Sequence, residues 1–197
     1  MAAALGTWTA VSQSKPKRIE GHTSNVEAPI LYVQYFQGTI GETTEAGDTY
    51  IIPHKFTNVK MIKAMPHAAV GATLLNGGEA AAADDGVYYS TAATITGPTQ
   101  ITTAATAGAS TVVLTSASAI NDVYNNCWVK ITFDNGNEQV VKVTDYVGAS
   151  TTATLADPLA QDIAATGSYY TVLGTLMTVS GVAATPTLSF EIIGTFE

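Results

Sequence analysis

The sequence predicts an all-β fold: an antiparallel β-sandwich base, an inserted small antiparallel β module and an extended N-terminal arm. Aromatic and β-branched residues alternate with polar residues in several runs of strand length. Turn signals rich in glycine and asparagine separate these runs. The stretch 58–78 could also form a short helix, but Pro66 and Gly71 interrupt it. Together these observations favour strands over helices along the chain.

The composition is poor in charge and rich in apolar residues. Charged residues make up 12% of the chain and apolar residues 46%, whereas disordered chains combine low hydrophobicity with high charge. Such a chain suits a protein that packs against copies of itself or a partner. It also suits an ordinary threonine-rich β protein, and both interpretations stay open. The 197 residues are enough for one domain, or for a core domain with a small second one.

The net charge of −8 argues against binding to nucleic acid, which normally requires a basic stripe. No apolar run reaches the roughly 18 residues of a membrane span. In the first residues positive charge follows a weakly apolar segment, the reverse of a secretory signal. We therefore expect no nucleic-acid partner, no membrane partner, and assembly in a cytoplasm. The basic residues form three separate groups: Lys15, Lys17 and Arg18; Lys55, Lys60 and Lys63; and Lys130 with Lys142.

Residues 1–25 are predicted to form the extended arm. They are mostly small and polar and sustain neither a helical nor a strand period. A lone tryptophan in such a segment indicates that the segment docks on a neighbour rather than frays. We therefore expect Trp8, Lys15, Lys17 and Arg18 to contact a partner, with a tail of no role as the alternative.

Residues 26–98 and 173–197 are predicted to form the base domain together. Pro53 cannot donate to a β ladder, so its strand lies at an edge or ends there. The last strand alternates strictly and is expected to complete a sheet begun earlier in the chain. One continuous β-sandwich is the alternative. The expected strands lie within 28–41 and 47–56, and at Asn58–Met65, Val87–Ile95, Thr175–Val179 and Thr187–Phe196.

Residues 99–172 are predicted to form the inserted module, because they have few charges, many small residues and regularly spaced hairpin signals. An insertion is tolerated where its two ends lie close together. Its central hairpin spans Tyr124–Tyr146, with apolar and polar residues alternating on both sides of the turn Asp134–Glu138. The Asn-Gly pair explains that turn better than a calcium loop does, because the carboxylates lack the spacing of calcium ligands.

Residues that could carry chemistry form no recognisable motif. The three histidines, His22, His54 and His67, lack the spacing of metal ligands. The sequence contains no nucleophile elbow and no phosphate-binding loop. Cys127, the only cysteine, is predicted to be a small buried core residue rather than a reactive thiol. We therefore expect no catalytic residue, no metal, no cofactor and no enzymatic activity.

The segment Thr103–Val172 resembles a small β module found in structural proteins of tailed bacteriophages. The resemblance rests on the opening ATAGAST, on Ala119, Asp122 and Tyr124, on the run TDYVG, and on the closing GSYYTV. Such modules occur in head, neck and fibre proteins alike. The flanking base, with its N-terminal arm and C-terminal strand, resembles a capsid decoration (cement) protein.

This resemblance implies a structural virion protein that binds the outer surface of a phage capsid and stabilises it by bridging major capsid subunits. It implies the capsid surface as the location and a homo-oligomer, with a trimer favoured over a dimer. A tail fibre or adaptor module that binds a host receptor or glycan is the alternative. Stacking faces for that alternative, for which strand packing is the plainer role, would be Tyr88, Tyr89, Tyr169 and Tyr170.

Overall fold

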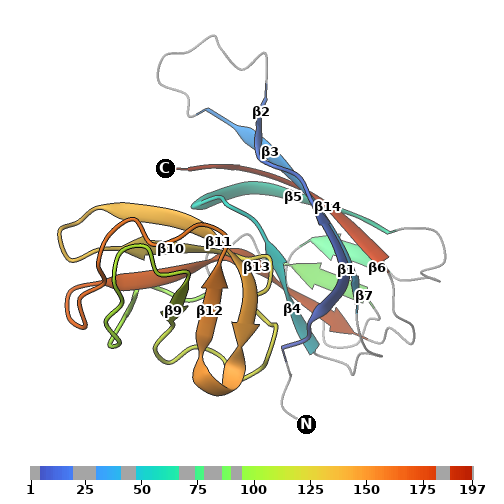
Figure 1. Cartoon of the computed structure of the whole chain (residues 1–197). Coiled ribbons are helices and arrows are strands. Elements are labelled where there is room, and N and C mark those ends of the chain that lie inside the picture. Colours follow the sequence, from blue (N-terminus) through green and yellow to red (C-terminus); the bar gives the residue numbers. More distant parts are fainter. Residues whose placement is uncertain are drawn as a thin grey trace. The chain divides into compact units, whose positions relative to one another are not determined.

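The computed structural model describes an almost entirely β chain, which confirms the predicted fold class. It falls into two compact units: unit 1 comprises Met1–Ala93 and Thr175–Glu197, and unit 2 comprises Thr94–Gly174. Figure 1 shows the strands of both units. One 3-10 turn, Gly148–Ser150, is the only helical element among the described residues. Those residues are 5–19, 30–40, 48–66, 74–77, 86–89, 95–180 and 187–196.

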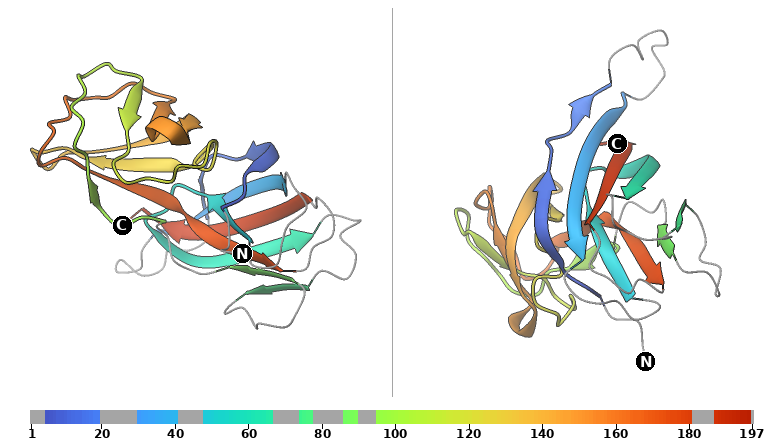
Figure 2. Two further views of the ribbon diagram at one scale, coloured as in Figure 1. Left: turned by 90° about the horizontal axis from the view of Figure 1, so that it is seen from below. Right: turned by 90° about the vertical axis from the view of Figure 1, so that its right-hand side faces the viewer.

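The first sheet of unit 1 is antiparallel, with the strand order β1-β3-β14-β5 and the short β2 also paired to β3. Figure 2 shows β14 between β3 and β5. The pairing of β14 with β3 runs from Thr187 opposite Thr39 to Gly194 opposite Tyr32, so the last strand does complete an earlier sheet. The strands are β1 (Trp8–Gln13), β2 (Lys17–Arg18), β3 (Tyr32–Ile40), β5 (Asn58–Pro66) and β14 (Thr187–Thr195).

The second sheet of unit 1 forms around the last residues of β13 (Tyr169–Ser180). β4 (Asp48–Pro53) pairs with β13 and ends at Pro53, as expected of a residue that cannot donate to a ladder. β7 (Gly86–Tyr89) pairs antiparallel with β13, and β6 (Leu74–Gly77) pairs parallel with β7. This parallel pair is an exception to the antiparallel pattern.

Large apolar side chains from both sheets form the core of unit 1, which makes it a β-sandwich. The Phe36 and Phe190 rings stack with their centroids 6.2 Å apart. Burial of such side chains is the main term that stabilises a sandwich of this kind. The buried residues of this core are Phe36, Ile40, Tyr50, Ile52, Phe56, Val59, Ile62, Met177, Leu188, Phe190 and Ile192.

The N-terminal segment corrects the prediction, because residues 5–19 are not an extended arm. β1 joins the sheet as a strand, and the Trp8 indole lies 5.2 Å from the Phe36 ring and donates to the Ile51 carbonyl at 2.6 Å. A tryptophan packed this way contributes more as part of the core than as a free anchor. The strand period was missed because a bulge at Ala10, with φ 38°, breaks the register. Residues 20–25 lie outside the described residues.

Unit 2 contains one antiparallel sheet with the strand order β8-β13-β10-β11-β12-β9. It begins earlier than residue 99, because the Ile95 amide donates to the Val172 carbonyl at 2.9 Å. Gly174 is its last residue, against the predicted Val172. The strands are β8 (Thr99–Gln100), β9 (Thr111–Val113), β10 (Trp128–Thr132), β11 (Glu138–Val147), β12 (Thr152–Leu155) and the part of β13 up to Gly174.

The predicted central hairpin of unit 2 is confirmed. β10 pairs with β11 from Trp128 opposite Lys142 to Thr132 opposite Glu138, and Gly136 takes a φ of 82° in the turn. One face is buried and the other carries the Lys130–Glu138 ion pair at 2.9 Å. The buried face consists of Val129, Ile131, Phe133, Val141 and Val143.

Tyrosine hydroxyls fix the loop that precedes this hairpin. Tyr146 donates to the Ser118 carbonyl and Tyr170 donates to the Thr115 carbonyl, the latter at 2.7 Å. The Tyr124 ring meets the Tyr146 ring edge-on, with centroids 4.7 Å apart. The amide of Asp122, a residue with φ 63°, donates to the Tyr146 carbonyl at 2.9 Å. Asp122 and Tyr124 therefore hold the loop against β11.

Candidate interaction surfaces

One face of the first sheet of unit 1 points away from the core and presents apolar side chains. Directly opposite residues in an antiparallel pair share a face, so the register defines its rows. Within the face Tyr35 is 48% exposed and Met61 44% exposed. We call this surface the outer face. One row contains Tyr35, Glu191 and Lys63, and the next contains Lys17, Val33, Ile193 and Met61.

Charge on the outer face is mostly positive and lies at its edges. Lys17 is on the edge strand β2, and Lys63 is on β5 at the other side. Glu191 lies between them. It raises the pKa of the Tyr35 hydroxyl, mainly through a hydrogen bond with Tyr35 and to a lesser degree through its negative charge. The outer face thus combines exposed apolar and aromatic side chains with lysines at the rim and one carboxylate, Glu191, between them.

A hollow with a volume of about 440 Å³ adjoins Tyr35 and is lined by both polar and aromatic side chains. Ser12 and Ser14 line it from the β1 side, and Gln37 and Ser189 line it from β3 and β14. The Ser14 hydroxyl accepts a hydrogen bond from the Tyr35 amide at 2.9 Å. These groups extend the outer face towards β1 with hydrogen-bonding side chains.

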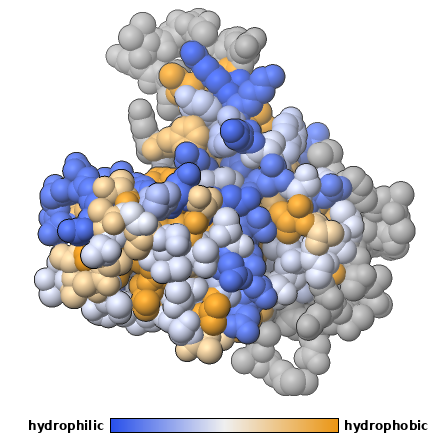
Figure 3. All heavy atoms as spheres, viewed as in Figure 1, coloured by the Kyte–Doolittle hydropathy of each residue, from blue (hydrophilic) through white to orange (hydrophobic). Residues whose placement is uncertain are grey.

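The predicted contact residues divide into two groups. Lys15, Lys17 and Arg18 are exposed, and Figure 3 shows hydrophilic side chains over β2. They form no ion pair with any other side chain in the part of the chain that the structure describes. Trp8 is different, because its ring packs against Phe36, Tyr50 and Phe190 inside unit 1. The contacts that Trp8 makes here are thus internal to unit 1, and its expected contact with a partner stays a prediction.

The tyrosines proposed as stacking faces do not act together. Tyr170 is buried and its hydroxyl donates a hydrogen bond to the Thr115 carbonyl, whereas Tyr169 is 40% exposed. The side chains of Tyr88 and Tyr89 lie outside the described residues. A glycan platform of all four residues is thus excluded, because Tyr170 belongs to the core of unit 2.

His54 is enclosed in unit 1. Its Nε2 atom lies 3.0 Å from the Thr175 hydroxyl, and its ring stacks on Phe56. Burial lowers the pKa of His54 to about 4, although a backbone hydrogen bond at Phe56 opposes the shift. A neutral imidazole without access to solvent is a core group and not a general base. His22 and His67 lie outside the described residues.

Among the described residues, no three histidine, cysteine or acidic side chains gather in a way that could hold a metal ion. None of the described helical segments is long and apolar enough to cross a membrane. Cys127 is buried as predicted, and burial raises the pKa of its thiol to about 12.

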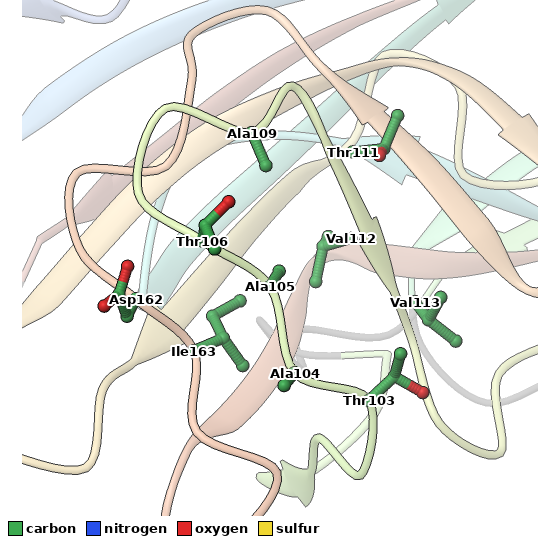
Figure 4. A pocket seen from close by; sticks show the side chains of 10 residues that line it. All are labelled: Thr103, Ala104, Ala105, Thr106, Ala109, Thr111, Val112, Val113, Asp162 and Ile163. Carbon is green, nitrogen blue, oxygen red and sulfur yellow. The ribbon is translucent and has the colours of Figure 1, made fainter.

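A second hollow, of about 520 Å³, lies in unit 2 inside the loop that runs from Thr103 to Val113. Val112 and Ile163 are buried at its floor, and Figure 4 shows their side chains pointing toward one another. Thr106 and the Asp162 carboxylate lie at its exposed rim. Sequence reasoning missed this hollow, since its residues read as an ordinary run of small side chains.

No protein family, curated protein or solved structure matches this chain. The surfaces described above are therefore interpreted from their own geometry. Sequence reasoning also missed the outer face, because both faces of β3 carry apolar residues. Gln34 is buried while Tyr35, the next residue, is exposed, which is the reverse of what hydropathy alone indicates.

Proposed function

We propose that this protein is a non-enzymatic structural component of a phage virion, which binds the outer surface of the capsid and bridges major capsid subunits. The proposal rests on the outer face of unit 1. Its exposed Tyr35 and Met61 are residue types enriched at protein interfaces. The resemblance of Thr103–Val172 to a phage structural module indicates which kind of partner to test.

A flat sheet face can bind a shell without a small polar pocket. Affinity would come from apolar area removed from water, and a stable interface of this kind buries roughly 800 Å² on each partner. Lys17 and Lys63 at the rim would favour a capsid surface that carries carboxylates, and would raise the association rate. Within this proposal the exposed Lys15 and Arg18 beside β2 extend the same contact.

The proposal places the protein on the capsid surface as a homo-oligomer, with a trimer favoured over a dimer. Sites shared by several capsid subunits present more than one copy of the same surface. An oligomer engages them together, and the later contacts become intramolecular. Sedimentation of the purified chain measures this oligomeric state directly.

Binding to phage heads tests the function. Purified heads that lack this protein are incubated with the wild-type chain, with a Tyr35→Ser/Met61→Ser double variant, and with a Val147→Ser/Ile120→Ser control. Val147 and Ile120 are similarly exposed but belong to unit 2. We expect wild type and control to bind in many copies per head, and the double variant to bind at least about tenfold more weakly.

The possible failures of this test separate the parts of the proposal. No binding of the wild-type chain to heads would overturn the proposed function. Equal binding of the wild type and the double variant would leave the function standing but remove the outer face as its site. Equal melting temperatures of the three proteins are required, because only then does a loss of binding report the surface rather than the fold.

A further inference from the structure

The hollow in unit 2 lies along the open edge of a β-sheet. β9 is the last strand of the order β8-β13-β10-β11-β12-β9 and has β12 on one side only. The Leu114 amide donates to Thr151 and the Leu155 amide donates to Ser110, each at 2.8 Å. In an antiparallel ladder, hydrogen-bonding residues alternate with residues whose peptide groups point outward. The N–H and C=O groups of Thr111 and Val113 therefore point away from β12.

Backbone hydrogen bonds also hold the opposite wall of the hollow in place. Ala105 exchanges two backbone hydrogen bonds with Ile163, at 3.1 and 2.7 Å. The two residues form an isolated bridge, and the Thr106 carbonyl on the same wall accepts a hydrogen bond from the Ala109 amide at 3.1 Å. The walls meet at one end, where the Thr102 amide donates to the Thr115 hydroxyl at 3.0 Å. The hollow is thus a short slot with the open backbone donors and acceptors of β9 along one side.

Side chains make the floor of the slot apolar and its entrance polar. Val112 and Ile163 are buried, and Ala105 and Ala109 are half-buried between them and solvent. Figure 4 shows the Ala105 side chain between those of Val112 and Ile163. A volume of about 520 Å³ has room for one aliphatic side chain together with the backbone that carries it.

Charge near the slot is negative. Asp162 lies at the rim, where one of its carboxylate oxygens accepts a hydrogen bond from the Ala107 amide at 2.7 Å. Both lysines of unit 2 are engaged elsewhere: Lys130 with Glu138, and Lys142 over the Trp128 ring. Against these two lysines, Thr94–Gly174 contains six carboxylates: Asp122, Asp134, Glu138, Asp145, Asp157 and Asp162.

We propose that this slot binds an extended segment of a partner protein, which adds to β9 as a short strand. Backbone groups of the segment pair with Thr111 and Val113, and one valine-sized side chain enters the slot above Val112. A lysine or arginine of the segment lies beside Asp162. This is recognition by strand addition, in which main-chain hydrogen bonds give affinity and a side-chain pocket gives selectivity. It goes beyond the proposed capsid binding, which concerns unit 1.

A randomised heptapeptide library displayed on a carrier is the probe, selected against the full-length chain. The expected enriched sequences combine a small aliphatic residue with a nearby lysine or arginine. A synthetic peptide of the enriched sequence is then measured against three variants. Val113→Pro deletes an outward N–H, which an edge strand tolerates, Ala104→Trp fills the slot, and Asp162→Asn removes the charge. Ala149→Trp, at another exposed alanine of unit 2, is the matched control.

Each variant has a defined outcome. We expect Val113→Pro and Ala104→Trp to weaken peptide binding about tenfold or more, and Asp162→Asn to weaken it several-fold in low salt. The control binds as the wild type does. Hydrogen exchange at the Thr111 and Val113 amides slows when peptide is bound. An empty selection overturns the proposal, and so does a peptide that binds Ala104→Trp and the wild type equally.

Discussion

The Nε2 atom of His54 lies 3.0 Å from the Thr175 hydroxyl inside unit 1, where burial lowers the histidine pKa to about 4. In the unfolded chain a histidine titrates near pH 6.5. As the pH falls, His54 therefore takes up a proton in the unfolded state before it does so in the folded state. The free energy of unfolding consequently decreases as the pH drops below about 6.5. We conclude that His54 makes unit 1 sensitive to acid.

Acid should destabilise the wild type more than a His54→Gln variant. Between pH 6.5 and 4, the difference in pKa corresponds to a loss of about 3 kcal/mol in the free energy of unfolding. Urea titrations at pH 7, 5.5 and 4.5 measure this loss in both proteins. The His54→Gln variant should lack only the part of the pH dependence that comes from His54. Parallel pH profiles for the two proteins would show that His54 is not buried in its neutral form.

Replacement of Trp8 tests whether the first strand belongs to the core. Trp8→Ala should lower the free energy of unfolding by about 2–3 kcal/mol, less than the loss for a fully buried aromatic side chain, because it removes contacts of a partly buried ring with Phe36 and Tyr50. Chemical denaturation measures the loss. Trp8→Phe is the control and should lose less. Unchanged stability would instead support the arm that the sequence predicted.

How far the sequence predicts the fold depends on how regular each strand is. The β10–β11 hairpin was predictable because unbroken alternation flanks the Asn135–Gly136 turn. β1 was not, because the bulge at Ala10 shifts its period in mid-strand. Interaction surfaces were harder still. Whether Tyr35 or Gln34 is buried depends on which other sheet covers β3, and this is a tertiary property.

Gly148 provides a test of packing in unit 2. A Cβ atom at this position would collide with the backbone of Ala119 and Ile120, whereas a Cβ at Gly97 would meet open space. Gly148→Ala should therefore cost about 1–3 kcal/mol, as overpacking usually does. Gly97→Ala is the matched control and should leave the thermal midpoint unchanged or slightly raised. An equal response of the two variants would mean that the loop at Ala119 does not pack on Gly148.

The single thiol reports the integrity of unit 2. Burial raises the pKa of Cys127 to about 12, so the native protein at pH 8 should react with a thiol reagent only when it unfolds. We expect no labelling in buffer within minutes and complete labelling in denaturant. The absorbance of the released reagent measures both. Rapid labelling of the folded protein would place Cys127 at the surface and contradict the core described for unit 2.

An electron cryomicroscopy reconstruction of phage heads bearing this protein tests the central proposal most directly. The account predicts density for the chain at many equivalent positions on the outside of the shell. It predicts that the face containing Tyr35 and Met61 contacts the major capsid subunits. A chain found only at the tail, or one bound to the shell with this face open to solvent, would contradict it.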